Sequence, residues 1–206
     1  MKNSVLLLHW RERWLALVLV AIMFVVGIVS GAITITAVTV PQRQDLVRYI
    51  NTYFESIMVG TLVPATWQSV VWGNFQVVAI LWLCGLLVFG APGILLLLFL
   101  RGFIIGFSVG FLVEEFGIRG FLFALSSIIP HNLLAVPAMV GLGASGIAFS
   151  FAVIFGANQR TVQRRGGTSV AKFSLNTIPY IFLMVLACLI EVLITPVFIR
   201  VATALF

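Results

Sequence analysis

The sequence predicts an all-α polytopic membrane protein with about five transmembrane helices, one external amphipathic helix and a proline-broken re-entrant segment. Of its 206 residues, 62% are hydrophobic and only 9% are charged, whereas a soluble domain averages about 25% charged residues. The charges cluster in a few short stretches. The apolar blocks between them reach about twenty residues or more, which is enough for a helix to cross a hydrocarbon core of about 30 Å.

The net charge of +6 does not indicate nucleic-acid binding here. In a membrane protein, Lys and Arg mark cytoplasmic loops and anionic headgroups, so the expected contact is the lipid bilayer. Cys84 and Cys188 lie inside apolar runs without metal-ligand spacing. We therefore expect neither a metal site nor a cofactor.

The apolar blocks and the basic residues together predict the topology of a single integral membrane domain, 1–206. Residues 1–13 are basic and should be cytoplasmic. The block that follows is too long for the h-region of a signal peptide, so it should be a retained helix. Trp67 and Trp72 are expected as interface anchors. The crossings before and after the central segment are predicted at 14–40, 67–90, 94–113 and 175–198.

The segment 116–157 is about forty residues long and is interrupted by Pro130 and Pro137. The segment after it, 158–172, is basic without any acid and should be cytoplasmic. With a cytoplasmic N-terminus, an odd number of crossings must then precede it. We expect one crossing plus a re-entrant hairpin packed against protein or lining a wet cavity, and an external C-terminus.

The segment 41–66 is predicted to form an external amphipathic helix with no net charge. Its apolar residues recur at helical spacing, and its polar residues fall mostly on the opposite side. We expect the aromatic face, namely Tyr49, Ile50, Tyr53 and Phe54, to dock a partner. The alternative is that this face rests on the chain's own helices or in the outer leaflet.

Gly102, Gly106 and Gly110 recur at intervals of four within a predicted transmembrane helix. Such a stripe allows two helix backbones to approach closely in lipid. Two interpretations are open, packing inside one subunit or a homodimer interface. Gly27 and Gly31 form a second, weaker pair of the same kind.

Four polar or charged residues fall inside the predicted membrane segments, where they are costly and suggest function: Arg101, His131, Asn132 and Glu191. From their positions along the helices, Arg101 and Glu191 should lie at different depths without a direct ion pair. Three roles are open for Glu191, as a buried hydrogen-bond partner, a partner-docking contact or a proton or ion relay. His131 and Asn132 are expected to satisfy backbone groups freed by the prolines.

No catalytic motif accompanies these residues. The chain has no G-x-S-x-G elbow, no H-E-x-x-H and no phosphate-binding loop. We expect no enzymatic activity. A transporter or channel subunit, for example the permease half of an ABC-type exporter, is the alternative, although that class predicts paired broken helices and only one break is evident.

Three segments show a specific resemblance over nearly the whole chain. They are PQRQDLVRYINTYFESI, FLRGFIIGFSVGFLVEEFG and GFLFALSSIIPHNLLAVPA, at Pro41–Ile57, Phe99–Gly117 and Gly120–Ala138. In these motifs the chain resembles the stage II sporulation protein M family of endospore-forming bacteria. The resemblance implies a multi-pass scaffold in the septal or engulfing membrane. Its implied partners are the cell-wall hydrolases stage II sporulation proteins D and P, which remodel peptidoglycan during engulfment.

Overall fold

The structure is a computed structural model that describes residues 2–58, 67–87, 89–155 and 159–193. Apart from short connections, these residues are helical, in the order α1 (Lys2–Thr34), η1 (Ile35–Ala37), α2 (Val40–Met58), α3 (Trp67–Leu86), α4 (Gly90–Ser127), α5 (Ile129–Phe155) and α6 (Gln159–Leu193). Five stretches are long and apolar enough to cross a membrane, at Trp14–Ala37, Trp67–Leu86, Gly90–Ser127, Ile129–Phe151 and Val170–Leu193. The predicted all-α polytopic fold is confirmed.

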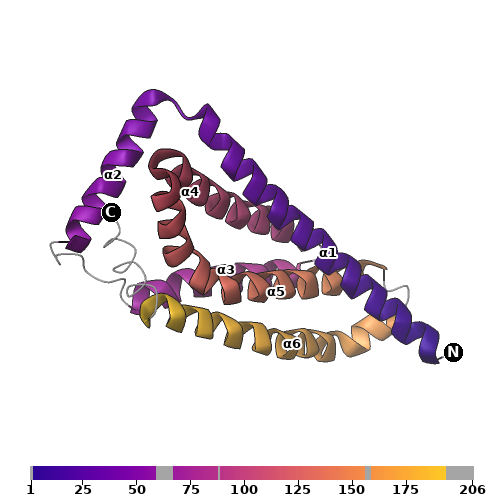
Figure 1. The fold of residues 1–206 in the computed structure, drawn as a ribbon. Helices are drawn as coiled ribbons and strands as arrows, with labels where there is room; N and C mark the ends of the chain where they lie inside the picture. The colour runs from indigo at the N-terminus through magenta and orange to yellow at the C-terminus, as the bar shows by residue number, and fades with distance from the viewer. Residues whose placement is uncertain (1, 59–66, 88, 156–158, 194–206) are drawn as a thin grey trace.

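Helix α5 is the centre of the bundle. Over half of its membrane-span window, 56%, is buried inside the protein, against 22–28% for the other four spans. Met139, Leu142 and Ile147 of α5 are almost fully buried and belong to one core cluster with side chains of the surrounding helices. In Figure 1, α3, α5 and α6 run side by side, whereas α1 and the first part of α4 are inclined to them. The five membrane-spanning helices are therefore not all parallel to one another.

The glycine stripe of α4 packs against α1 of the same chain. A Cβ atom on Gly102 would collide with the carbonyl oxygen of Phe24, and one on Gly106 would collide with that of Ile28. The contact is reciprocal, because Cβ atoms on Gly27 and Gly31 of α1 would collide with carbonyl oxygens of α4. Side chains are excluded from this seam, so the two backbones lie in direct contact. Gly110, further along, faces the Ile35 side chain.

The segment 116–157 is interrupted at two places, at Gly117 within α4 and at Ile128, directly before α5 and two residues before Pro130. Within α4, Gly117 has φ 57° and ψ −134°, and the helix changes direction there. A positive φ is open to glycine at little steric cost. Pro130 falls in the first turn of α5, where a missing N–H breaks no intrahelical bond, and Pro137 is accommodated inside α5. The expected hairpin is instead a short helix, 118–127, folded back at Gly117 and followed by α5 (Figure 1).

Two further boundaries differ from the sequence-based prediction. Residues 91–93, which the prediction leaves between two crossings, belong to the first turn of α4, because a proline fits the first helical turn. The basic segment 158–172 is predicted to connect two crossings. From Gln159 onward it forms the first part of α6. The residue types of this segment are compatible with a helix, since Arg, Gln and Lys have high helix propensity.

Candidate functional site

Helix α2 begins with a capping motif that the sequence carries as Thr39-Val40-Pro41-Gln42. The Gln42 Oε1 atom accepts hydrogen bonds from the backbone N–H of Thr39 at 3.1 Å and from its hydroxyl at 2.9 Å. This is the arrangement in which a glutamine at the third helical position satisfies the N-terminal backbone of its own helix. The turn between α1 and α2 is therefore specified locally, and its T-x-x-Q signature was available in the sequence.

One turn into α2, Arg43 joins the helix to α4. Its guanidinium hydrogen-bonds the carboxylate of Glu114, and its Nη1 atom lies 3.0 Å from Oε1 of Glu115. The second contact is ionic only, because Glu115 Oε1 accepts no well-formed hydrogen bond. The hydrogen bond and the charge of Glu114, with the charge of Glu115, raise the pKa of Arg43, which stays cationic. We refer to Arg43, Glu114 and Glu115 as the Arg43 clamp.

A small apolar cluster holds α2 against the folded-back helix 118–127. Ile50 packs on the buried residues Leu112, Phe123 and Ala124. Part of the face expected to dock a partner therefore contacts the chain itself. Tyr49 is 72% exposed. The side chains of Tyr53 and Phe54 lie outside the described residues, so the docking role of the aromatic face stays a prediction.

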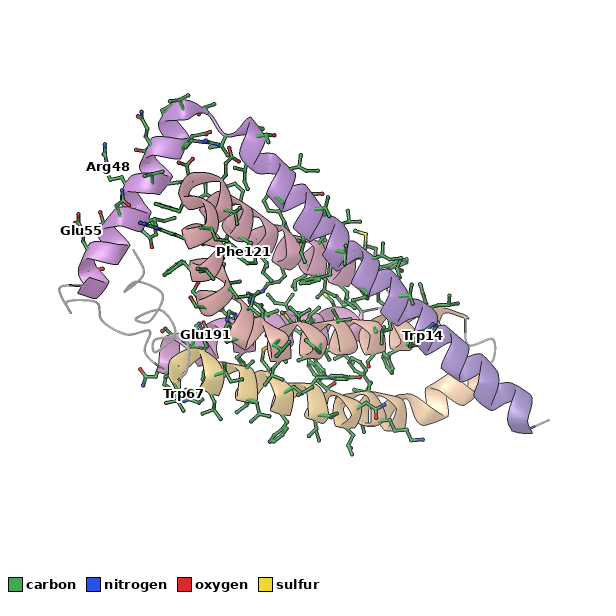
Figure 2. All side chains as sticks on the ribbon, viewed as in Figure 1. Trp14, Arg48, Glu55, Trp67, Phe121 and Glu191 are labelled. Carbon is green, nitrogen blue, oxygen red and sulfur yellow. The ribbon has the colours of Figure 1, made fainter. Side chains whose placement is uncertain are left out.

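The flank of α2 next to this contact forms an open groove of about 590 Å³. Both charge signs, amides and a hydroxyl line it, with two valines between them. Its lining, which we name the α2 groove, consists of Val40, Arg43, Gln44, Val47, Arg48, Asn51, Thr52, Glu55 and Glu115. Figure 2 shows Arg48 and Glu55 on the side of α2 turned away from the bundle.

A second polar group lies inside the bundle, where four helices contribute one side chain each. The Asn74 amide of α3 donates a hydrogen bond of 3.3 Å to Glu191 of α6. Glu191 also interacts electrostatically with Arg101 of α4 and His131 of α5. Among the described residues no ion pair within 4 Å joins Arg101 to Glu191, and the two interact only through their charges. The predicted membrane depths of Arg101 and Glu191 were counted from the ends of their helices, which is valid only for parallel helices. The first part of α4 is inclined to α6 (Figure 1).

The two polar residues next to Pro130 have different surroundings. The Asn132 amide donates a hydrogen bond of 2.7 Å to the carbonyl of Ile128, at the junction of α4 and α5. Ser126 and Ser127 donate to the carbonyl of Phe123 at the same junction. These side chains satisfy backbone groups where the helix is interrupted. The His131 Nδ1 atom is buried and has no hydrogen-bond partner among the described residues. No group of three metal-binding side chains gathers within the part of the chain that the structure describes.

Comparison with known proteins decides the family. The family model described as Stage II sporulation protein M matches residues 20–196, which is most of the chain. The chain belongs to the stage II sporulation protein M family. No curated protein and no solved structure matches it.

Membership in the stage II sporulation protein M family makes this a sporulation-related, multi-pass membrane protein. The matched residues include α2, the Arg43 clamp and the polar group around Glu191. The clamp and Asn74 are the features that sequence reasoning missed. For the clamp, the available signal was the acidic pair Glu114-Glu115, which has no basic neighbour within the following three residues. For Asn74, it was an amide inside an apolar span.

Proposed function

We propose that this protein is a non-enzymatic membrane scaffold. It recruits and positions peptidoglycan hydrolases at the septum during engulfment in endospore formation. Its partners on this proposal are the stage II sporulation proteins D and P, which resemblance to the family implies. The scaffold acts by holding a docking surface at a fixed place above the bilayer, and no step of the hydrolysis falls to its own residues.

The observation that supports this proposal best is the bracing of α2. The helix is fixed at its start by the Thr39–Gln42 cap, in its second turn by the Arg43 clamp and near its middle by Ile50. A helix held at three points loses little conformational entropy on binding, and pre-organisation of that kind strengthens association. Its free flank carries the α2 groove. A polar and accessible helix that is joined to the bundle by Arg43 and Ile50 suits a platform for other proteins.

The basic residues of the chain favour the orientation that the proposal requires. With Lys2, Arg11 and Arg13 in the cytoplasm, α2 lies outside, beside the cell wall. The basic stretch at the start of α6 then also lies in the cytoplasm. This orientation places α2 in the same compartment as the hydrolase domains and their substrate.

Co-purification from sporulating cells tests the scaffold role. The tagged full-length protein, solubilised in mild detergent, should recover proteins D and P, and its deletion should leave both hydrolases dispersed and engulfment arrested. A matched sample from vegetative cells expressing the three proteins separates direct recruitment from other sporulation factors. If both hydrolases localise normally to the septum in cells that lack this protein, the scaffold proposal is wrong.

A transporter or channel subunit is the second candidate, and the polar group around Glu191 is the observation in its favour. Charged residues inside a membrane-spanning bundle are typical of ion and proton pathways. The group contains one acid and one guanidinium, so its formal charges balance without a bound ion. Flux measurements on the purified protein in vesicles test this candidate. A Glu191→Gln variant should stop any flux that uses this group.

A further inference from the structure

We infer that the partner docks lengthwise in the α2 groove as a polar helical segment carrying charges of both signs. This inference rests on the proposed scaffold function and names the surface and the kind of segment that the scaffold would bind. It moves the contact from the aromatic face of α2 to the polar flank beside it.

The aromatic face is already engaged in part by the chain itself. Ile50 is half-buried against Leu112 and Phe123, and this contact helps to fix α2. The groove residues are more accessible. Arg48, Asn51 and Glu55 are exposed, and neither Arg48 nor Glu55 forms an ion pair within the described part of the chain. Their hydrogen-bonding capacity is available to a partner.

The spacing of the lining residues favours a helix as the occupant. They recur every three or four positions along α2, from Val40 to Glu55. Side chains at this spacing form ridges along one face of a helix, and the grooves between such ridges receive the ridges of a second helix. The row extends over about 22 Å at a rise of 1.5 Å per residue, so a partner helix of about four turns would cover it.

The charges along the groove favour protein over lipid. At one end Arg43 and Glu115 line the groove and pair with each other, so their charges balance. Arg48 follows in the middle and Glu55 at the other end. Anionic headgroups require a basic surface, which this alternation does not provide. A segment with an acidic residue opposite Arg48 and a basic residue opposite Glu55 is complementary to it.

Site-specific photo-crosslinking tests the position of the contact. A photoreactive residue replaces Arg48 or Asn51 in the full-length protein in sporulating cells that carry tagged proteins D and P. Matched probes replace Asp45 and Tyr49, which are exposed outside the groove on the same helix. We expect adducts with D or P from positions 48 and 51 and few from 45 and 49. Adducts from 49 or 45 alone, or with lipid alone at 48 and 51, would overturn the inference.

A charge exchange tests the recognition itself. Arg48→Glu combined with Glu55→Arg keeps the composition and net charge but reverses the order of charges. We expect recovery of the hydrolases to fall by about tenfold, equivalent to about 1.4 kcal/mol, with unchanged accumulation in the membrane. Asp45→Arg, a charge reversal outside the groove, should leave recovery within about twofold of wild type.

Different results would contradict the scaffold role and the docking of the partner in the α2 groove. Undiminished recovery by the exchanged variant, while wild type recovers D and P, overturns the groove and leaves the scaffold role standing. No recovery by wild type removes the scaffold role and the inference with it. If the exchanged variant does not accumulate, the crosslinks from positions 48 and 51 decide the matter alone.

Discussion

Gly106 of α4 lies against the backbone of Ile28 in α1, so closely that no side chain fits between them. Replacing Gly106 with leucine should force the two helices apart. Overpacking of a tight interface costs about 1–3 kcal/mol, and here the obstacle is backbone, which cannot rotate away. We expect a lower unfolding temperature in detergent and a reduced yield of folded protein.

The control for this substitution is Gly73→Leu. Gly73 lies in another transmembrane helix, and nothing is within 4 Å of a Cβ atom built there. This variant should unfold at the wild-type temperature or slightly above it, because leucine favours helix more than glycine does. Wild-type stability and self-association of Gly106→Leu would show that the stripe faces lipid.

Gly117 should resist substitution for a different reason. No atom lies within 4 Å of a Cβ atom built on it, but its φ of 57° with ψ −134° is strained for any other residue. Such a conformation costs about 1–3 kcal/mol for an L-residue. Gly117→Ala should lower the unfolding temperature, whereas Gly73→Ala should not. Equal stability of the two variants would mean that α4 changes direction without help from glycine.

The Arg43 clamp should hold α2 locally without determining the stability of the whole bundle. Arg43→Glu brings three carboxylates together, so α2 should detach from α4. Spin labels at Asp45 and Ile118, both exposed, should then report a broader distance distribution. Global unfolding should stay unchanged, since exposed ion pairs contribute little to it.

Charge exchange supplies the control for the clamp. Arg43→Glu combined with Glu114→Arg and Glu115→Arg restores opposite charges and should narrow the distribution again. Arg48→Glu, the same change at a position without an ion pair among the described residues, should leave it as in wild type. A narrow distribution in Arg43→Glu would show that Ile50 and the cap hold α2 alone.

Topology is tested by labelling single cysteines with a membrane-impermeant reagent in intact cells, in a background with Cys84 and Cys188 replaced by alanine. A cysteine at Glu55 should react, and one at Arg164 should react only after the membrane is permeabilised. The expectation follows from the basic residues at the N-terminus and before the last span. Labelling of position 164 in intact cells would invert the orientation and place α2 away from the wall.

The sequence was informative about features that depend on local composition. The spans were predictable because apolar length alone decides whether a helix can cross a bilayer. A boundary near Pro130 was predictable, because a proline fits the first turn of a helix, and α5 begins at Ile129. Pro137, in contrast, is accommodated inside α5, and a second change of direction lies at Gly117. Gly117 carried no periodicity signal of its own. Its role depends on the direction in which the chain must continue.

The candidate site depended on contacts between distant residues and was therefore less predictable. Arg43 and its acidic partners are separated by 71 positions, and many other pairings of so few charges were compatible with the sequence. The docking role of the aromatic face of α2 stays a prediction. The partial use of this face by the chain itself, through Ile50 and Phe123, required the folded-back helix 118–127.

Substitution of Glu191 separates its structural role from a charge-dependent one. Glu191→Ala removes one of the two acceptors of the Asn74 amide, which also donates to the carbonyl of Val70, and it removes the acid that interacts with Arg101. Loss of one partner of a buried hydrogen bond costs about 1–3 kcal/mol, so the unfolding temperature should fall clearly. Glu191→Gln keeps an oxygen that accepts from Asn74, and we expect it to recover most of this loss.

The Glu191→Gln variant isolates the charge, because glutamine has nearly the same shape as the glutamate that meets α3, whereas alanine removes both the charge and the hydrogen-bonding atoms. If Glu191→Gln is as unstable as Glu191→Ala, the interaction with Arg101 and His131 outweighs the hydrogen bond, since only the charge differs from wild type. If Glu191→Gln is stable and still supports engulfment, a relay of protons or ions through this group is excluded. A stable but inactive Glu191→Gln protein would instead favour the transport candidate over the scaffold.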